Sequence, residues 1–254
     1  MDMRFRRRLM SHFLNSRLNI VRYLEDDYIY IPNGISSIDL FIVGGGGGGG
    51  HHSNSSNIAG HGGNGGEVKH YYDIAVTPGM GIEISIGSGG TGGTKSGKAT
   101  TARGTAGGNT VVTVNGNTYI AQGGSGGTNG SISVEPIDSQ PIGNVGGKSA
   151  RPGYAQGVAG TQGIRCELDE FDLNYYGASG SGGGNCNQFT PILIVGGETG
   201  GGYGGYGANN DATNTGGDAT FYGAGGGGGG FNSKHTTGAG GKGYQGIVII
   251  RYNR

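Results

Sequence analysis

Two uninterrupted glycine runs, seven residues at Gly44–Gly50 and six at Gly225–Gly230, constrain the fold of this chain more than any other feature. Glycine loses more backbone entropy on ordering than any other residue, so such runs become ordered only when something regular holds them. The regular option is an extended left-handed helix with three residues per turn and no internal hydrogen bonds. Every N–H and C=O then points outward, and glycine lets neighbouring segments approach closely and bond to one another.

The composition makes such a scaffold the main source of stability. Of 254 residues, 64 are glycine, while Leu, Ile, Val and Phe together form about a fifth of the chain, which is too little for a large apolar core. Disorder is the alternative, but the chain is formally neutral and contains 14 Tyr and 7 Phe, unlike most disordered segments. We expect a mainly β and irregular fold, with packed polyglycine II-type helices collared by short β-strands.

Strand signals separate the glycine segments. Asn115-Gly116 lies between two short strand-like runs and tolerates the positive φ angles of a tight hairpin, and Pro78-Gly79 favours a type II turn between two strands. The predicted strands cover residues 38–43, 68–76, 82–86, 112–114, 118–121, 192–195 and 246–252.

The amino-terminal segment is strongly basic. Residues 1–24 contain six arginines and one acid, so this segment carries a formal charge of +5 and the remainder −5. We expect residues 1–31 to form a basic helix or strap that docks on a partner, and residues 32–254 to form the glycine-rich domain. The predicted docking residues, several of them at helix-like spacing, are Arg4, Phe5, Arg6, Arg7, Arg8, Leu9 and Phe13. An Arg-rich start of this kind also fits a mitochondrial presequence, but little after it resembles a matrix enzyme.

Residues 131–176 are poorer in glycine and are expected to be an insertion carried by the scaffold. Their acidic cluster lacks the spacing of an EF-hand and is interpreted as a solvated face; it comprises Glu167, Asp169, Glu170 and Asp172. Cys166 and Cys186 have no CxxC spacing, and we expect two free thiols.

No catalytic, metal or cofactor site is predicted. Matches to short glycine motifs are expected by chance in such a chain, and Gly92–Ala99 lacks the Ser or Thr that a phosphate-binding loop needs. The histidines His51, His52, His61 and His70 fit a polar surface better than a metal cluster. No constellation of nucleophile, base and orienting group stands out, and we expect no enzyme.

Tyrosines beside glycine loops are the candidate recognition residues. Flat amphipathic rings bind sugars or proteins at low entropy cost, and the alternative is that they fill gaps in a core short of aliphatic side chains. The candidates for receptor contact are Tyr175, Tyr176, Tyr203 and Tyr206.

The order of four motifs resembles the glycine-rich domain of phage tail and virion proteins and of some bacterial proteins. These motifs are IDLFIVGGGGGGG, VTPGMGIEISIGSGGTGG, TPILIVGG with GAGGGGGG, and GKGYQGIVIIRY, within residues 36–252. The resemblance implies polyglycine helices and receptor-binding loops at one end. The basic head and the insertion lie outside the shared pattern, and the head resembles the amino-terminal arm of some proteins from Bacteroides and their phages.

We therefore expect a virion structural protein, assembled in the host cytoplasm, of the tail-fibre or adhesin type. Its expected partners are other virion proteins, a host-surface glycan or protein, and further copies of itself, with a trimer as one option. Membrane insertion is not expected, because the chain has no run of about twenty apolar residues. Nucleic acid is not an expected partner either. The alternatives are a head decoration protein and a bacterial surface or matrix protein.

Overall fold

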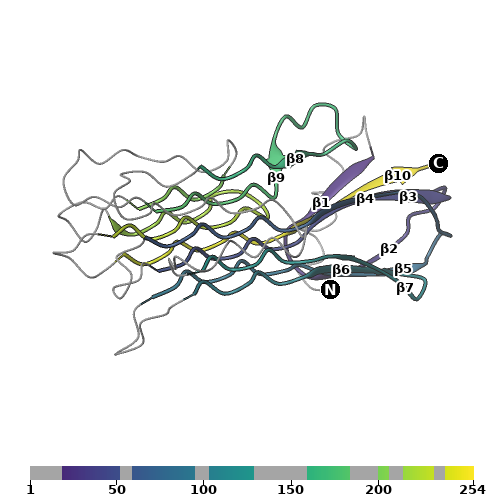
Figure 1. The fold of residues 1–254 in the computed structure, drawn as a ribbon. Coiled ribbons are helices and arrows are strands. Elements are labelled where there is room, and N and C mark those ends of the chain that lie inside the picture. The colour runs from purple at the N-terminus through teal and green to yellow at the C-terminus, as the bar shows by residue number, and fades with distance from the viewer. Residues whose placement is uncertain are drawn as a thin grey trace, which may run out of the picture.

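The computed structural model describes residues 19–51, 59–94, 103–128, 159–183, 200–205, 214–231 and 238–254. Short strands form antiparallel sheets at one end of the molecule, and glycine-rich segments run side by side from them (Figure 1). The strands are β1 Ile20–Tyr23, β2 Asp27–Tyr30, β3 Ser37–Val43, β4 Val68–Ala75, β5 Gly81–Ser85, β6 Thr110–Val114, β7 Asn117–Ala121, β8 Ile164–Arg165, β9 Tyr175–Tyr176 and β10 Ile247–Asn253. The expected mainly β and irregular class is confirmed.

Two four-stranded sheets contain most of these strands. Sheet A has the order β1-β10-β3-β4, sheet B has the order β2-β5-β6-β7, and β8 pairs with β9. The basic helix or strap predicted for residues 1–31 does not extend over all of them, because Val21 lies in a strand and pairs with Ile250 of β10. Pairing with a distant strand has overridden a local periodicity there. The predicted docking residues 4–13 lie outside the described residues.

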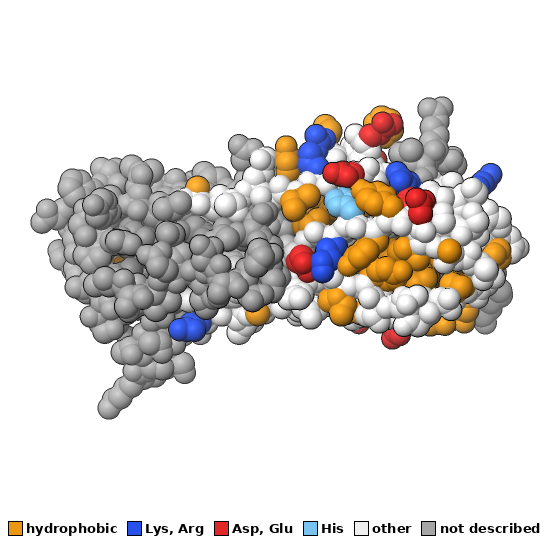
Figure 2. Space-filling model, turned by 45° about the vertical axis from the view of Figure 1, so that its right-hand side comes forward, with side chains coloured by type: hydrophobic (Ala, Val, Ile, Leu, Met, Phe, Trp, Pro, Cys, Tyr) orange, Lys and Arg blue, Asp and Glu red, His pale blue; other side chains and the backbone are white. Residues whose placement is uncertain are grey.

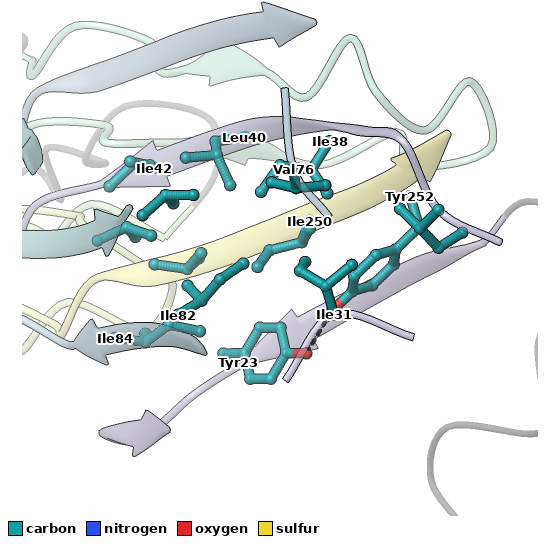
Figure 3. Close-up of a cluster of buried hydrophobic side chains, with 14 of the residues drawn as sticks. Tyr23, Ile31, Ile38, Leu40, Ile42, Val76, Ile82, Ile84, Ile250 and Tyr252 are labelled. Carbon is teal, nitrogen blue, oxygen red and sulfur yellow. Dashed lines mark hydrogen bonds between the residues drawn. The ribbon is translucent and has the colours of Figure 1, made fainter. Parts of the chain in front are cut away.

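The main core lies between the two sheets. Ile38, Leu40 and Ile42 of β3 pack with the inward side chains of β5, β6 and β10, and alternate residues of each strand point to the same side (Figure 3). Tyr23 and Tyr252 join their hydroxyls at 2.9 Å in the same cluster. Sheet A and sheet B therefore form a small sandwich around an almost wholly aliphatic core.

The central strands of sheet A are buried on both faces. Phe41 and Ile249 point away from sheet B and pack in a second cluster with Cys166, Leu168 and Tyr176 of the β8–β9 region. Burial on both sides explains why β3 and β10 read as nearly continuous apolar runs without alternation.

Both predicted turns are confirmed. Asn115 and Gly116 have φ angles of 49° and 75° and join β6 to β7 in a hairpin. Gly79 has a φ of 79°, and the amide of Met80 donates to the carbonyl of Thr77 across the turn. This second turn passes the chain from β4 in sheet A to β5 in sheet B, so it links the two layers. The predicted strand at residues 192–195 lies outside the described residues.

The glycine segments continue the strands, and their hydrogen-bond partners repeat every three residues. In the run that follows β3, the amides of Gly44, Gly47 and Gly50 donate to the carbonyls of Glu67, Asn64 and His61. The amides of Gly45 and Gly48 donate to segment 105–108, and the amides of Gly46 and Gly49 donate to segment 241–244. Carbonyls of the same run accept from segments 90–93, 124–127 and 226–229. One central glycine run is thus hydrogen-bonded to six neighbours.

Glycine is required in this run because there is no space for a side chain. A Cβ at Gly46, Gly47 or Gly48 would overlap a backbone carbonyl of Ala224, Ser125 or Thr91 in turn. Each overlap involves backbone of a neighbouring segment, which cannot rotate out of the way. Close backbone packing and hydrogen bonding therefore hold this part of the molecule, as the composition predicts.

Candidate functional site

The candidate site is the loop of residues 164–176, which covers the outer face of sheet A. The two ends of the loop pair as β8 and β9, with Ile164 opposite Tyr176. Cys166, Leu168 and Tyr176 turn inward and pack with Phe41 and Ile249. The ring of Tyr176 lies edge-on to Phe41, with centroids 5.0 Å apart. The base of the loop is therefore part of the core.

Arg22 of β1 fixes the tip of this loop. Its Nη2 atom donates to Oδ2 of Asp169 at 2.7 Å and to Oδ2 of Asp172 at 3.2 Å. The side chains of the two carboxylates are only 7% and 2% exposed. Asp172 also accepts hydrogen bonds from the hydroxyl of Tyr176 and from the backbone and side-chain amides of Asn174. One arginine thus closes a network between two distant parts of the chain.

The electrostatics of this network favour the ionised carboxylate. Burial raises the pKa of Asp172, but the hydrogen bonds from Tyr176, Asn174 and Arg22 outweigh burial, and the pKa lies below its ordinary value. Burial and the neighbouring Asp172 raise the pKa of Tyr176. Burial lowers the pKa of Arg22, and its two carboxylate partners raise it further than that, so the guanidinium stays charged. The loop is held by a permanent ion pair at neutral pH.

The anchored loop holds two apolar side chains in the solvent. Phe171 is 74% exposed and Leu173 is 69% exposed, although both lie within a few residues of the buried aspartates. The hydroxyl of Tyr72 donates to Glu167 at 2.9 Å and ties the loop to the edge strand β4. Hydrophobic side chains stand beside acidic and basic ones on this side of the molecule (Figure 2). A fixed loop with exposed apolar groups is suited to contact with another molecule.

The predicted tyrosines do not form one surface. Tyr176 is 2% exposed, and its place in the core removes its ring from contact with a receptor. Tyr175 is partly exposed beside Arg165, whose guanidinium carbon lies 5.8 Å from the ring centroid. Tyr203 is exposed, and Tyr206 lies outside the described residues. Receptor contact through Tyr175, Tyr203 or Tyr206 stays a prediction.

The interpretation of the acidic cluster as a solvated face is wrong for half of its members. Asp169 and Asp172 are buried, because Arg22 compensates their charge, whereas Glu167 and Glu170 are exposed. Sequence reasoning also missed Phe171 and Leu173. The available signal was the occurrence of apolar residues within the acidic stretch ELDEFDL.

Cys166 carries a free thiol, while Cys186 lies outside the described residues. Burial raises the pKa of the Cys166 thiol, with smaller opposing effects from backbone amides. Among the described residues, no group of three or more His, Cys, Asp or Glu is placed to hold a metal ion. No helix in the same part of the chain is long and apolar enough to cross a membrane.

Comparison with known proteins adds one finding. A family model described as a glycine-rich domain matches residues 25–253. The match begins between β1 and β2 and ends at the last residue of β10, so it covers both sheets except β1. The search of curated proteins found no match.

Proposed function

We propose that this chain, which belongs to the glycine-rich domain family, is a bacteriophage virion structural protein of the tail-fibre or adhesin type. In this proposal the basic head that precedes β1 docks on other virion proteins, and loops carried by the scaffold contact a glycan or protein on the host surface. The protein assembles in the host cytoplasm, functions in the virion and catalyses no reaction. The anchored loop with Phe171 and Leu173 is the observation on which the recognition role depends.

The scaffold supports a mechanical role. Partners that repeat every three residues are what an extended helix with three residues per turn would give, and we infer that the glycine segments are polyglycine II helices. Six neighbours around one run brace that run from all sides. A run hydrogen-bonded to neighbours on all sides resists bending, as an attachment protein requires.

The anchored loop supports a recognition role. Contact with another molecule costs entropy when a loop must first be ordered, and the Arg22 network removes most of that cost in advance. Exposed phenylalanine and leucine side chains gain free energy when they are buried in an apolar pocket, at about 25 cal/mol per Å². The exposed carboxylates of Glu167 and Glu170 would favour a pocket with a basic rim.

The test combines mass spectrometry of purified phage particles with an adsorption-blocking assay. We expect the protein in the particles, and we expect the purified protein to block adsorption of phage to its host. A Phe171→Ser, Leu173→Ser double variant should lose blocking but keep its fold, because neither side chain contributes to the core. Ile120→Ser, at another exposed apolar position, is the matched control and should block normally.

Two outcomes decide between the alternatives. Absence from the particles would overturn the virion assignment and favour a bacterial surface or matrix protein. Presence in the particles without blocking would favour a head decoration role. Replacing Arg4, Arg6, Arg7 and Arg8 by glutamine should abolish incorporation into particles, and normal incorporation of that variant would contradict the docking role of the head.

A further inference from the structure

A second candidate surface lies on the outer face of sheet B, far in the chain from the anchored loop. Ile82 and Ile84 of β5 point into the core, so Glu83 points outward together with its cross-strand partner Tyr28. Tyr30 lies two residues further along β2 on the same face. Tyr28 and Tyr30 are 57% and 66% exposed, although they are among the largest side chains of the sandwich.

The two tyrosine rings form an open corner. Their centroids lie 5.3 Å apart and their planes meet at 78°. The ring of Tyr28 extends across β5, and its hydroxyl lies where a Cβ of residue 81 would be if that residue were not glycine. Glycine at position 81 therefore lets the ring lie against the sheet. One ring thus forms the floor of the corner and the other ring forms its wall.

The charge beside this corner is acidic. Glu83 lies on the same face as the two tyrosines, the strands of sheet B contain no lysine or arginine, and Glu25 and Asp26 directly precede β2. Asp27 alternates to the other face with Ile29 and is not part of the corner. Within the part of the chain that the structure describes, Glu83 forms no ion pair. Tyrosine faces attract cations, and the planar guanidinium of arginine stacks on a ring while it donates to a carboxylate. The corner is therefore suited to an arginine side chain.

We propose that the corner formed by Tyr28, Tyr30 and Glu83 binds the arginine-rich segment of residues 4–8 of a second copy of this chain. Charge complementarity supports this occupant, because residues 1–24 carry +5 and the remainder of the chain −5. A contact between the head of one copy and the sheet of the next joins two different surfaces. Repetition of this contact gives a ring if it closes and a chain of copies if it does not.

This inference goes beyond the proposed function and is tested on the pure protein. Sedimentation velocity of the full-length chain should show self-association at 50 mM NaCl and a monomer at 500 mM, where charges are screened within a few ångströms. Tyr28→Leu should weaken association about 2- to 30-fold, as expected for the loss of one cation–π contact of about 0.5–2 kcal/mol. Glu83→Lys should abolish association. Glu170→Lys makes the same charge reversal at another exposed carboxylate and should leave association unchanged.

A mixing experiment identifies the occupant. A head variant with Arg4, Arg6, Arg7 and Arg8 replaced by glutamine keeps an intact corner, and Glu83→Lys keeps an intact head. Each variant alone should be monomeric, and an equimolar mixture should form a heterodimer. A monomeric wild-type protein, or a mixture of the two variants that stays monomeric, would overturn the proposal. The head would then bind the corner of its own chain, or would not bind a corner at all. Circular dichroism and the melting temperature of each variant show whether it is folded. Glu83→Lys keeps all arginines of the head, so its normal incorporation into particles would show that docking on other virion proteins does not depend on this self-association.

Discussion

The glycine packing can be tested by one methyl group placed in the centre of the bundle. In Gly47→Ala the new Cβ overlaps the carbonyl of Ser125, and backbone atoms of Gly124 lie beside it. Overpacking of this kind costs about 1–3 kcal/mol. The displaced segment also strains two hydrogen bonds of 2.9 Å, one from the amide of Gly47 to Asn64 and one from Gly226 to the carbonyl of Gly47. Each is worth about 1 kcal/mol.

Alanine also lowers the conformational entropy of the unfolded chain, and this stabilises the folded state by about 0.4–1 kcal/mol and offsets part of the loss. The expected net loss is about 2–4 kcal/mol of unfolding free energy, a large part of the 5–15 kcal/mol that typical domains possess. For a chain of 254 residues this lowers the melting temperature by about 4–16 °C. Urea unfolding followed by circular dichroism measures the loss directly.

Gly34→Ala is the matched control for this experiment. Gly34 has a φ of 81° and nothing within 4 Å of an added Cβ, so only the backbone conformation is penalised, by about 1 kcal/mol. The two variants make the same chemical change and differ in whether there is space for it. Equal losses of stability for Gly47→Ala and Gly34→Ala would refute the close-packing explanation of the glycine run.

Three further predictions concern the sandwich and the anchored loop. Arg22→Gln leaves two buried carboxylates without their cation, at an expected cost of about 3–5 kcal/mol of unfolding free energy. Hydrogen exchange should then accelerate in residues 169–176 and stay slow in the β6–β7 hairpin. Equal acceleration in both regions would contradict a local role of Arg22. Burial raises the pKa of Asp39, but hydrogen bonds from Asn253, the amide of Asp73 and Arg251 outweigh burial, so the pKa is lowered overall, as it is for Asp172. Both carboxyls therefore stabilise the folded state at pH values above their unfolded pKa of about 3.9. The contribution of these two carboxyls to stability should therefore be constant near neutral pH and be lost as the pH falls below about 4, and Asp39→Asn should reduce that loss in urea unfolding. The thiol of Cys166 should resist iodoacetamide at pH 8 in the native protein and react in guanidinium, as measured by peptide mass spectrometry; rapid native labelling would show that the loop opens.

Local signals in the sequence were sufficient for much of the fold. Asn115-Gly116 and Pro78-Gly79 determine their turns through φ angles that few other residue pairs adopt, so both turns were predictable. The glycine runs likewise determine their own packing, because a segment without side chains can be stabilised mainly through its backbone. The sequence signals for these features lie in residues that are adjacent in the chain.

Contacts between distant residues were not predictable in this way. The residues of β1 and β2 were assigned to the basic head because that segment is rich in arginine, yet β1 pairs with a strand about 230 residues later. Asp169 and Asp172 look like solvent-exposed acids until Arg22, almost 150 residues earlier, is placed beside them. The corner of Tyr28, Tyr30 and Glu83 depends in the same way on the register between β2 and β5.

Because hydrogen-bond partners repeat every three residues, the effect of an insertion in the glycine bundle should depend on whether its length is a multiple of three. If the segments are the polyglycine II helices that we propose, inserting three residues adds one full turn of about 9 Å and leaves every later amide directed at the same neighbour. Inserting one residue turns everything beyond it by a third of a revolution, so each amide then meets a different neighbour. Natural relatives and engineered versions of this scaffold should therefore differ in length by multiples of three within the bundle, while its connecting loops can change by any number.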